Sequence, residues 1–343
     1  MSEPFADLAP VDERRQALLE AKLRALVRDH TGRDGTGAPF GLGAGLLAGD
    51  TAWALVDRDP ARSLGAVLAW ARRHAASQVH VVVGGEERDA AGVLARRAGA
   101  FASPPSVWVA EGRDLAAAPP AAPPAEEPLD SRVARLADVL IDAGVDLVVE
   151  HGVLLGEVLG LEVARVVSGR DEPMLELGVG RFDRDATHEL YGAAPPADTL
   201  AGVVEVVRHH RRPGAAPHPL NRLAPERWLR ARLLGEPALV AAAHLEPVAP
   251  PLPRANLAQP SVAPAVGTDA AGGPVVAVCS VGIDLDLVPA AADVRLAHAP
   301  EDARLVLVLP ERDDHPVTRA LAAALRHPAG VETVPGDWRA HVA

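Results

Sequence analysis

The spacing of apolar residues predicts a helix near the N-terminal end of the chain. In residues 12–29 (VDERRQALLEAKLRALVR), apolar side chains recur three and four positions apart. This is the period of an α-helix with one apolar face. That face would carry Leu18, Leu19, Leu23 and Leu26.

A second pattern begins beyond residue 50, where short β-rich runs alternate with Ala-rich segments of helical length. A Gly-rich stretch at 31–49 precedes the first run, and we expect it to be a loop. Strands that alternate with helices are typical of a parallel sheet with crossover connections. The predicted strands are 51–57, 78–84 and 106–112.

The middle of the chain has a different pattern. The tract AAAPPAAPPAEEP (116–128) predicts a semi-rigid linker, and a helix is expected at 130–143. Two long β-leaning runs, 146–167 and 173–180, are joined by short loops, which favours antiparallel hairpins over crossovers. Further helices are predicted at 185–191, 197–209 and 225–234.

Beyond a second Pro-rich stretch, the strand-helix pattern returns. The predicted strands are 274–282, 303–311 and 330–335, with helices between the last two. The two outer segments share a spacing of roughly 25 to 30 residues per strand-helix step, as βαβ units do. They could form one sheet interrupted by the middle unit or two small sheets, and no matching residues establish a duplication.

The predicted fold class is therefore α/β, with Rossmann-like βαβ units in the N- and C-terminal segments flanking an α+β middle unit with antiparallel hairpins. The predicted divisions are an N-terminal α/β unit (1–115), a Pro/Ala-rich linker (116–129), a middle unit with a basic segment (130–245), a Pro-rich linker (246–274) and a C-terminal α/β unit (275–343).

Composition and charge limit the partners, the disulfide bonds and the cellular location that we expect. The formal net charge of −12 disfavours non-specific adhesion of the whole molecule to nucleic acid or anionic lipid. Cys279, the one cysteine, lies in an apolar run, so we expect a core thiol and no intramolecular disulfide. The segment MSEPFADLAP carries acid where a secretory signal carries Lys or Arg, and no apolar run reaches the roughly 18 residues of a membrane span. We expect a cytoplasmic protein without membrane association.

The glycines do not predict a nucleotide cofactor. Gly41, Gly43 and Gly45 precede the first of the predicted strands, whereas a phosphate-binding loop follows its strand. The pair Gly84-Gly85 runs directly into two glutamates, which would repel a phosphate.

Carboxylates on the middle β-leaning runs suggest a metal site. If these strands pair as a hairpin, Glu162 and Glu176 lie on neighbouring strands, and with Glu157 they could hold Mg²⁺ or Mn²⁺. In this hypothesis Glu162, Glu176 and Arg181 are the catalytic residues. The alternative is that these glutamates form the polar face of half-exposed strands, paired with Arg165 or Arg181.

The order of helix, hairpin carboxylates and following strand is loosely similar to the PD-(D/E)XK nuclease core. The resemblance covers about 50 residues. It departs from that pattern at Glu176-Leu177-Gly178, where a Glu-x-Lys is expected and no lysine occurs; Arg181 alone could substitute.

A basic segment at 206–232 follows the carboxylates. Arginine side chains beside a metal site would suit a phosphodiester substrate, and Trp228 could stack on a base. The alternative is a solvated helix face and loop in an arginine-biased chain. His209-His210 has no partner at a zinc-like spacing apart from His218, so a zinc site is not expected. The predicted phosphate contacts are Arg208, Arg211, Arg212, Arg222, Arg227 and Arg230.

An alternative site lies at the ends of the C-terminal strands, where open α/β sheets usually bind ligands. The carboxylates and the imidazole of Asp284, Asp286, Asp313, Asp314 and His315 could hold a metal or act as acid and base. Asp314, before His315-Pro316, also fits a helix cap.

Two functions follow from these residues. One is a divalent-metal-dependent, nuclease-like or phosphodiester-binding protein that acts on nucleic acid or another phosphate-bearing ligand through the middle unit. The other is a non-enzymatic α/β scaffold, or a sensor that binds a small ligand at the C-terminal strand ends.

Overall fold

The structure is a computed structural model, and it describes most of the chain. The described residues are 13–341 apart from 126–127, 168–171, 193–196, 213, 255 and 258. Within them the chain is an α/β protein with three sheets: two mixed sheets that contain parallel strand pairs, and a middle sheet that is antiparallel throughout.

The chain forms two compact units, each of which combines separate stretches of sequence. Unit 1 contains the N-terminal sheet, and unit 2 contains the middle and C-terminal sheets. Unit 1 comprises the residues up to 123 together with 283–293 and 315–329, and unit 2 comprises 124–282, 294–314 and the residues from 330 onward.

The sheet of unit 1 follows chain order, β1-β2-β3-β4-β5-β6. The pairs β3–β4 and β4–β5 are parallel, as the alternating pattern predicts, and the other neighbours are antiparallel. The strands are β1 (Thr36–Phe40), β2 (Gly43–Ala48), β3 (Thr51–Val56), β4 (Gln78–Gly84), β5 (Ser106–Glu111) and β6 (Asp114–Ala117).

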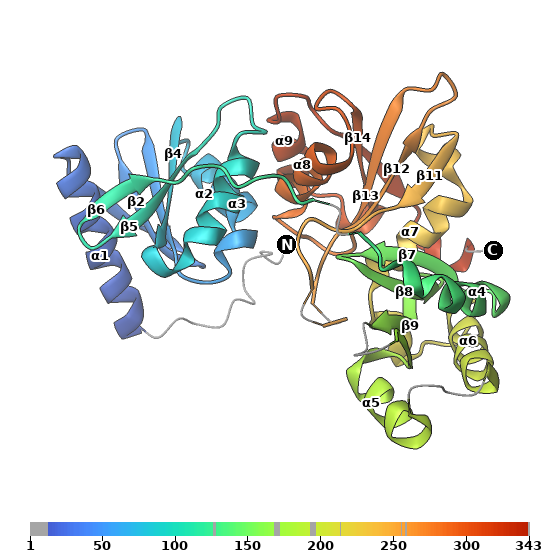
Figure 1. Cartoon of the computed structure of the whole chain (residues 1–343). Helices are drawn as coiled ribbons and strands as arrows, with labels where there is room; N and C mark the ends of the chain where they lie inside the picture. Colours follow the sequence, from blue (N-terminus) through green and yellow to red (C-terminus); the bar gives the residue numbers. More distant parts are fainter. Residues whose placement is uncertain are drawn as a thin grey trace. The chain divides into compact units, whose positions relative to one another are not determined.

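Helices cover both faces of this sheet (Figure 1). On one face α1 packs Leu23, Leu26 and Val27 against side chains such as Leu46 and Trp53. The helix is confirmed, but the prediction for Leu18 is wrong, since that side chain is 66% exposed. The helices of unit 1 are α1 (Glu13–Thr31), α2 (Leu64–Arg73), α3 (Arg88–Ala98) and, from the C-terminal part of the chain, α9 (Pro316–Ala323), which packs on α2.

The prediction of a loop for the Gly-rich stretch is wrong, because both β1 and β2 lie within it. Glycine is needed here for close packing. A Cβ on Gly43 would lie 2.0 Å from the carbonyl oxygen of Leu55, and one on Gly45 would lie 2.4 Å from the Trp70 ring. The glycines that suggest a loop in sequence therefore permit a tightly packed strand.

The middle sheet of unit 2 has the order β10-β9-β8-β7 and is antiparallel throughout, which confirms the predicted hairpins. Its core includes Leu140, Leu161, Val163 and Val207. The elements are α4 (Ala134–Asp142), β7 (Asp146–Glu150), β8 (Val153–Val158), β9 (Leu161–Val167), β10 (Met174–Leu177), α5 (Gly180–Tyr191) and α6 (Ala197–Arg211).

The second sheet of unit 2 has the order β11-β12-β13-β14-β15, with β13–β14 and β14–β15 parallel. Helix α7 packs on β11, β12 and β13 through Trp228, Leu229 and Leu233. The elements are α7 (Pro225–Gly235), β11 (His244–Pro247), β12 (Ala263–Thr268), β13 (Pro274–Cys279), β14 (Arg304–Pro310) and β15 (Gly330–Val334). Helix α8 (Leu287–His298) is divided: its residues up to 293 belong to unit 1 and those from 294 belong to unit 2.

The N- and C-terminal sheets are separate sheets with the same element order. Each begins with a helix and three antiparallel strands, and each continues with helix, parallel strand, helix and parallel strand. The middle sheet repeats the first four of these elements. The return of the strand-helix pattern was predicted from sequence, but the antiparallel strands β1, β2, β11 and β12 that precede it in the two segments were not.

Two further predictions concern burial and membranes. Cys279 is a fully buried core residue, as predicted, and burial raises the pKa of its thiol to about 12. Among the described helices, none combines the length and the apolar character that crossing a membrane requires.

Candidate functional site

The predicted carboxylates come together on the middle sheet because of an irregularity in strand pairing. The register between β8 and β9 shifts at Gly156/Glu157, so that Glu157 lies opposite Glu162. A bulge of this kind changes which side chains share a face of the sheet. Both side chains are buried, at 3% and 2% exposure.

Two arginines of α7 neutralise these carboxylates. Arg227 and Arg230 lie three positions apart and so share one face of the helix. Arg230 Nη2 donates to Glu157 Oε2 at 2.9 Å, Arg227 Nη1 lies 3.0 Å from Glu157 Oε1, and Arg227 also donates to Glu150. Burial alone would raise the pKa of Glu157, but Arg230 and Arg227 more than offset it, so the pKa lies below its usual range.

Glu162 and Glu176 do lie on neighbouring strands, and a guanidinium contacts both of them. Arg184 Nη1 donates to Glu162 Oε1 at 3.1 Å, and its Nε lies 3.5 Å from Glu176 Oε2. Arg165, the strand partner of Glu176, donates to Glu162 at 2.7 Å. The alternative pairing with Arg165 is thus present for Glu162, whereas Arg181 is exposed and lies 3.5 Å from Asp185.

The glutamates predicted to bind a metal ion are instead engaged with arginines. Within the described residues, no group of three or more His, Cys, Asp or Glu side chains could hold a metal ion. The carboxylate oxygens of Glu157, Glu162 and Glu176 contact arginine nitrogens. These nitrogens occupy the positions that a metal ion bound by the same oxygens would need. The Mg²⁺ or Mn²⁺ site stays a prediction, and its ligands are engaged in ion pairs.

The six arginines predicted to contact phosphate divide into two groups. In the first group, Arg227 and Arg230 form ion pairs with carboxylates. Arg208 donates to the Gly144 carbonyl. Arg211 is buried and donates to three backbone carbonyls, those of Leu159, Leu220 and Leu223. Burial lowers the pKa of Arg211 to about 10. The other two, Arg212 and Arg222, are exposed and line a cavity.

Trp228 does not offer a stacking surface for a base. Its side chain is 2% exposed, and the Arg211 guanidinium lies over its ring at 4.9 Å from the centroid. Arg339 lies over the same ring at 5.6 Å, and Trp338 packs edge-on against it. The indole is part of the core beneath the cavity.

The alternative set of residues is divided between the two units. In unit 1, Asp286 is buried and accepts from Arg97 at 2.8 Å, while Asp284 accepts from the Asp286 backbone N–H. Burial, partly offset by Arg97, raises the pKa of Asp286 to about 7. His315, rather than Asp314, caps α9, since its Nδ1 accepts from the Val317 N–H.

In unit 2, Asp313 lies at the end of β14. Its Oδ2 accepts from the Gly282 N–H at 2.8 Å, which ties the segment after β13 to the segment after β14. Asp314 follows it in the same unit. The residues of this set are therefore parts of loop, cap and ion-pair structure.

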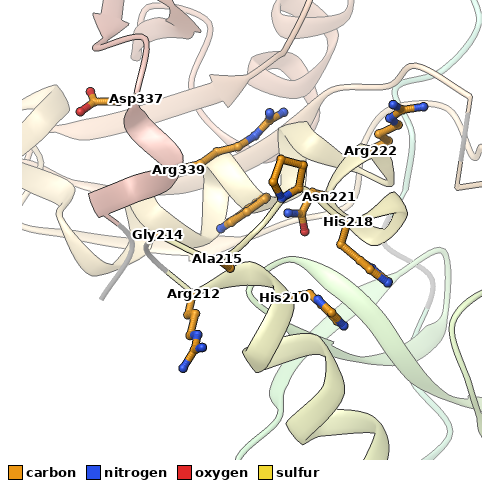
Figure 2. A pocket seen from close by; sticks show the side chains of 11 residues that line it. His210, Arg212, Gly214, Ala215, His218, Asn221, Arg222, Asp337 and Arg339 are labelled. Atoms are coloured by element: carbon orange, nitrogen blue, oxygen red, sulfur yellow. The ribbon is translucent and has the colours of Figure 1, made fainter.

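A cationic cavity of 410 Å³ in unit 2 joins the basic segment to the end of the C-terminal sheet (Figure 2). His210 lies in the last turn of α6, Arg212 and His218 come from the connection between α6 and α7, and Arg339 comes from the turn that follows β15. The cavity has a volume typical of small-molecule sites. The remaining lining residues are Gly214, Ala215, Pro217, Asn221, Arg222, Trp228 and Asp337.

Two histidine rings form one wall of this cavity. His210 and His218 stack with 3.6 Å between ring centroids, and Figure 2 shows them side by side. His218 Nδ1 accepts from the Leu220 N–H, which fixes that ring. Partial burial, followed by His218 and His209, lowers the pKa of His210 below its usual value. A largely neutral imidazole can donate or accept a hydrogen bond at this wall.

The cavity retains unused hydrogen-bonding capacity. Arg212 and Arg222 form no ion pair within the part of the chain that the structure describes. Asn221 Oδ1 and Trp228 Nε1 are buried and have no hydrogen-bond partner among the described residues. Arg339, Asp337 and Asn221 were not predicted as site residues, and sequence spacing offered no sign that positions 339 and 222 would line the same cavity.

No protein-family model, curated protein or solved structure significantly matches this chain. The functional proposal therefore rests on the geometry of the cavity.

Proposed function

We propose that unit 2 binds a small phosphate-bearing ligand in the cavity lined by Arg212, Arg222 and Arg339. The observation that carries the proposal is that these three arginines, which come from separate segments of unit 2, line one cavity of 410 Å³. Guanidinium groups bind phosphate oxygens through charge-assisted, often bidentate hydrogen bonds.

Charge supports a terminal phosphate as the recognised group. Three guanidinium groups against the single carboxylate of Asp337 leave two positive charges at the cavity. A phosphate monoester carries about −1.5 to −2 at pH 7. The rings of His210 and His218 add nitrogens that can donate to the remaining phosphate oxygens or to a hydroxyl group of the ligand.

The position of the cavity fits the Rossmann-like character proposed for the outer segments. Asp337 and Arg339 follow β15, the last strand of a sheet that contains two parallel pairs. Ligands of open α/β sheets commonly bind beyond the carboxyl ends of such strands. The proposal thus combines two arginines of the predicted basic segment with Arg339, which lies beyond a strand end but outside the strand-end set predicted from sequence.

Binding of a long nucleic acid has less support. Four of the six arginines predicted to contact phosphate are engaged with carboxylates or backbone carbonyls, and Trp228 is buried. A track of free cations and a stacking aromatic, the usual features of a single-strand site, are not formed by these residues.

Calorimetric titration of the full chain with phenyl phosphate, inorganic phosphate and a short single-stranded oligonucleotide tests the proposal. Phenyl phosphate should bind saturably, and its affinity should fall as salt rises. Arg222→Ala should weaken it about tenfold, the effect of one charge-assisted hydrogen bond. Arg181→Ala, an exposed arginine of the same unit, is the matched control and should leave affinity unchanged.

Two outcomes would reject this function. One is that Arg212→Ala/Arg222→Ala binds phenyl phosphate as tightly as the wild type. The other is that the oligonucleotide binds more tightly than phenyl phosphate and is cleaved when Mn²⁺ is added, which would favour the nuclease-like hypothesis instead.

A further inference from the structure

A second cavity in unit 2, of 530 Å³, is built from both Pro-rich stretches that the sequence presents as linkers. Pro124 and Pro128 belong to the first stretch, and Pro250 belongs to the second. The turn between β7 and β8 contributes His151, and the second half of α8 contributes Ala297. Segments predicted to separate domains thus meet as the wall of one cavity.

The chemistry of this wall differs from that of the phosphate cavity. Five of the sixteen lining residues are prolines, which have no backbone N–H and offer only carbonyl acceptors. The lining that the structure describes contains no lysine or arginine, and it includes Glu246, whose exposed carboxylate also lies 3.0 Å from His244 Nε2. Leu129, Val149 and Val294 supply apolar surface. The cavity therefore combines apolar surface with many carbonyl acceptors, and the rings of His151 and His298 are the side-chain donors in its described lining.

Two features suit the cavity to a defined ligand. Proline fixes its own backbone angle, so these walls lose little conformational freedom when a ligand binds. His151 Nε2 is buried without a hydrogen-bond partner among the described residues. His151 and Gly152 have φ of 50° and 71°, and such a pair of positive values fits the two-residue turn that joins β7 to β8.

We propose that this cavity binds a small molecule that has an apolar body and an ammonium group. The apolar body packs on the proline and valine side chains. The ammonium group donates to the Glu246 carboxylate, which His244 also contacts, and to carbonyl oxygens of the Pro-rich walls. This site is independent of the phosphate cavity, and it has the opposite preference for charge.

Saturation-transfer NMR and calorimetry on the full chain test the inference with two probes of similar shape, phenethylamine and phenylacetate. Phenethylamine should bind saturably, and phenylacetate should bind at least about tenfold more weakly. Glu246→Gln should reduce that preference about tenfold. Because Glu246 is an exposed side chain, this variant should keep the fold, which circular dichroism would check.

A second pair of variants locates the binding. Ala297→Phe fills the cavity and should abolish phenethylamine binding. Leu296→Phe adds an aromatic ring to the same helix at a side chain that is 42% exposed and does not line the cavity, and it should bind normally. The inference is overturned if phenethylamine shows no saturable binding, if phenylacetate binds equally well, or if Ala297→Phe binds as the wild type does.

Discussion

Each unit buries a pair of arginines on one helix, but the two pairs receive their carboxylates from very different distances along the chain. In unit 2, Arg230 of α7 binds Glu157, 73 positions away on a neighbouring hairpin. In unit 1, Arg96 of α3 binds Asp293, 197 positions away. These buried arginines therefore serve as anchors between segments, whereas the proposed ligand site relies on the exposed Arg212 and Arg222 and the half-buried Arg339.

The two units also differ in which part of the sequence supplies the partners of their buried arginines. Unit 2 contains the hairpin that supplies the partners of α7. Unit 1 is completed by residues 283–293 and 315–329, and the fit is close: a Cβ on Gly65 would lie 1.7 Å from the Leu285 carbonyl oxygen. All strands of the unit 1 sheet come from one stretch of sequence, whereas some of the residues that pack against α2 and α3 come from the distant segments 283–293 and 315–329.

The largest expected effect is on a fragment that ends at residue 123. Without Asp286 and Asp293, the buried guanidinium groups of Arg96 and Arg97 have no partners, at a cost of several kcal/mol. This is a large part of the roughly 5–15 kcal/mol that stabilises a typical domain. The fragment should show no cooperative thermal transition by circular dichroism.

A fusion of that fragment to residues 283–329 through a flexible linker is the control. It should regain a cooperative transition, because it restores both carboxylates and α9. A cooperative transition in the fragment alone would show that the distant segment is dispensable, and the contrast between the units would then disappear.

The next effect concerns the anchor of unit 2. Arg230→Met should lower the free energy of unfolding by about 3–5 kcal/mol, because Glu157 loses a buried partner. Urea denaturation would measure it. Glu157→Leu/Arg230→Met should recover most of that loss, since the double variant leaves neither charge unpaired. Equal losses in the single and double variants would contradict an ion-pair role.

A third prediction concerns the pH dependence of folding stability, to which His80 of unit 1 should contribute. His80 accepts from Trp108 Nε1 at 3.0 Å and stacks on Trp53. Burial, and then His30, lower its pKa from 6.5 to about 4. Between these values the unfolded chain binds a proton that the folded chain does not, so stability that is present above pH 6.5 is lost as pH falls towards 4.

The expected loss is about 1–2 kcal/mol, reduced from the full linkage value because the ring is nearly half exposed. The measurement is the free energy of unfolding of the wild type minus that of His80→Gln, at about pH 7 and about pH 4.5. This difference should shrink at the lower pH. A difference independent of pH would assign the acid sensitivity of unit 1 to other groups.

The smallest expected effect is on an arginine of the cavity. Arg222→Ala should change the free energy of unfolding by less than about 0.5 kcal/mol, because this exposed side chain forms no ion pair among the described residues. Urea denaturation beside Arg230→Met makes the comparison direct. A loss like that of Arg230→Met would make Arg222 another anchor and would remove support for the cavity as a ligand site.

Sequence periodicity predicted the elements that carry uniform patterns. The strands β3, β4 and β5 and the hairpins of the middle sheet were identified from their β-rich runs. The strands β1, β2 and β12 were missed because they contain glycine or proline, residues that usually indicate loops. At Gly43 and Gly45 those residues instead permit close contact with Leu55 and Trp70.

The candidate site was less accessible to sequence reasoning. The proximity of Glu162 to Glu176 follows from the predicted hairpin, but the arginines that bind them do not. Which carboxylate meets Arg227 depends on a one-residue bulge in β9 and on how α7 packs. Likewise, Arg339 meets the basic segment only through tertiary packing. Periodicity along the chain contains no information on such contacts.

The burial of Cys279 has a practical consequence. It is the single thiol of the chain, it lies in the core, and its pKa of about 12 leaves almost no thiolate at neutral pH. A cysteine introduced at an exposed position, such as 113 or 181, should therefore react with a maleimide dye while the native thiol stays silent. The wild-type sequence is already a background for site-specific labelling, with no native residue to remove.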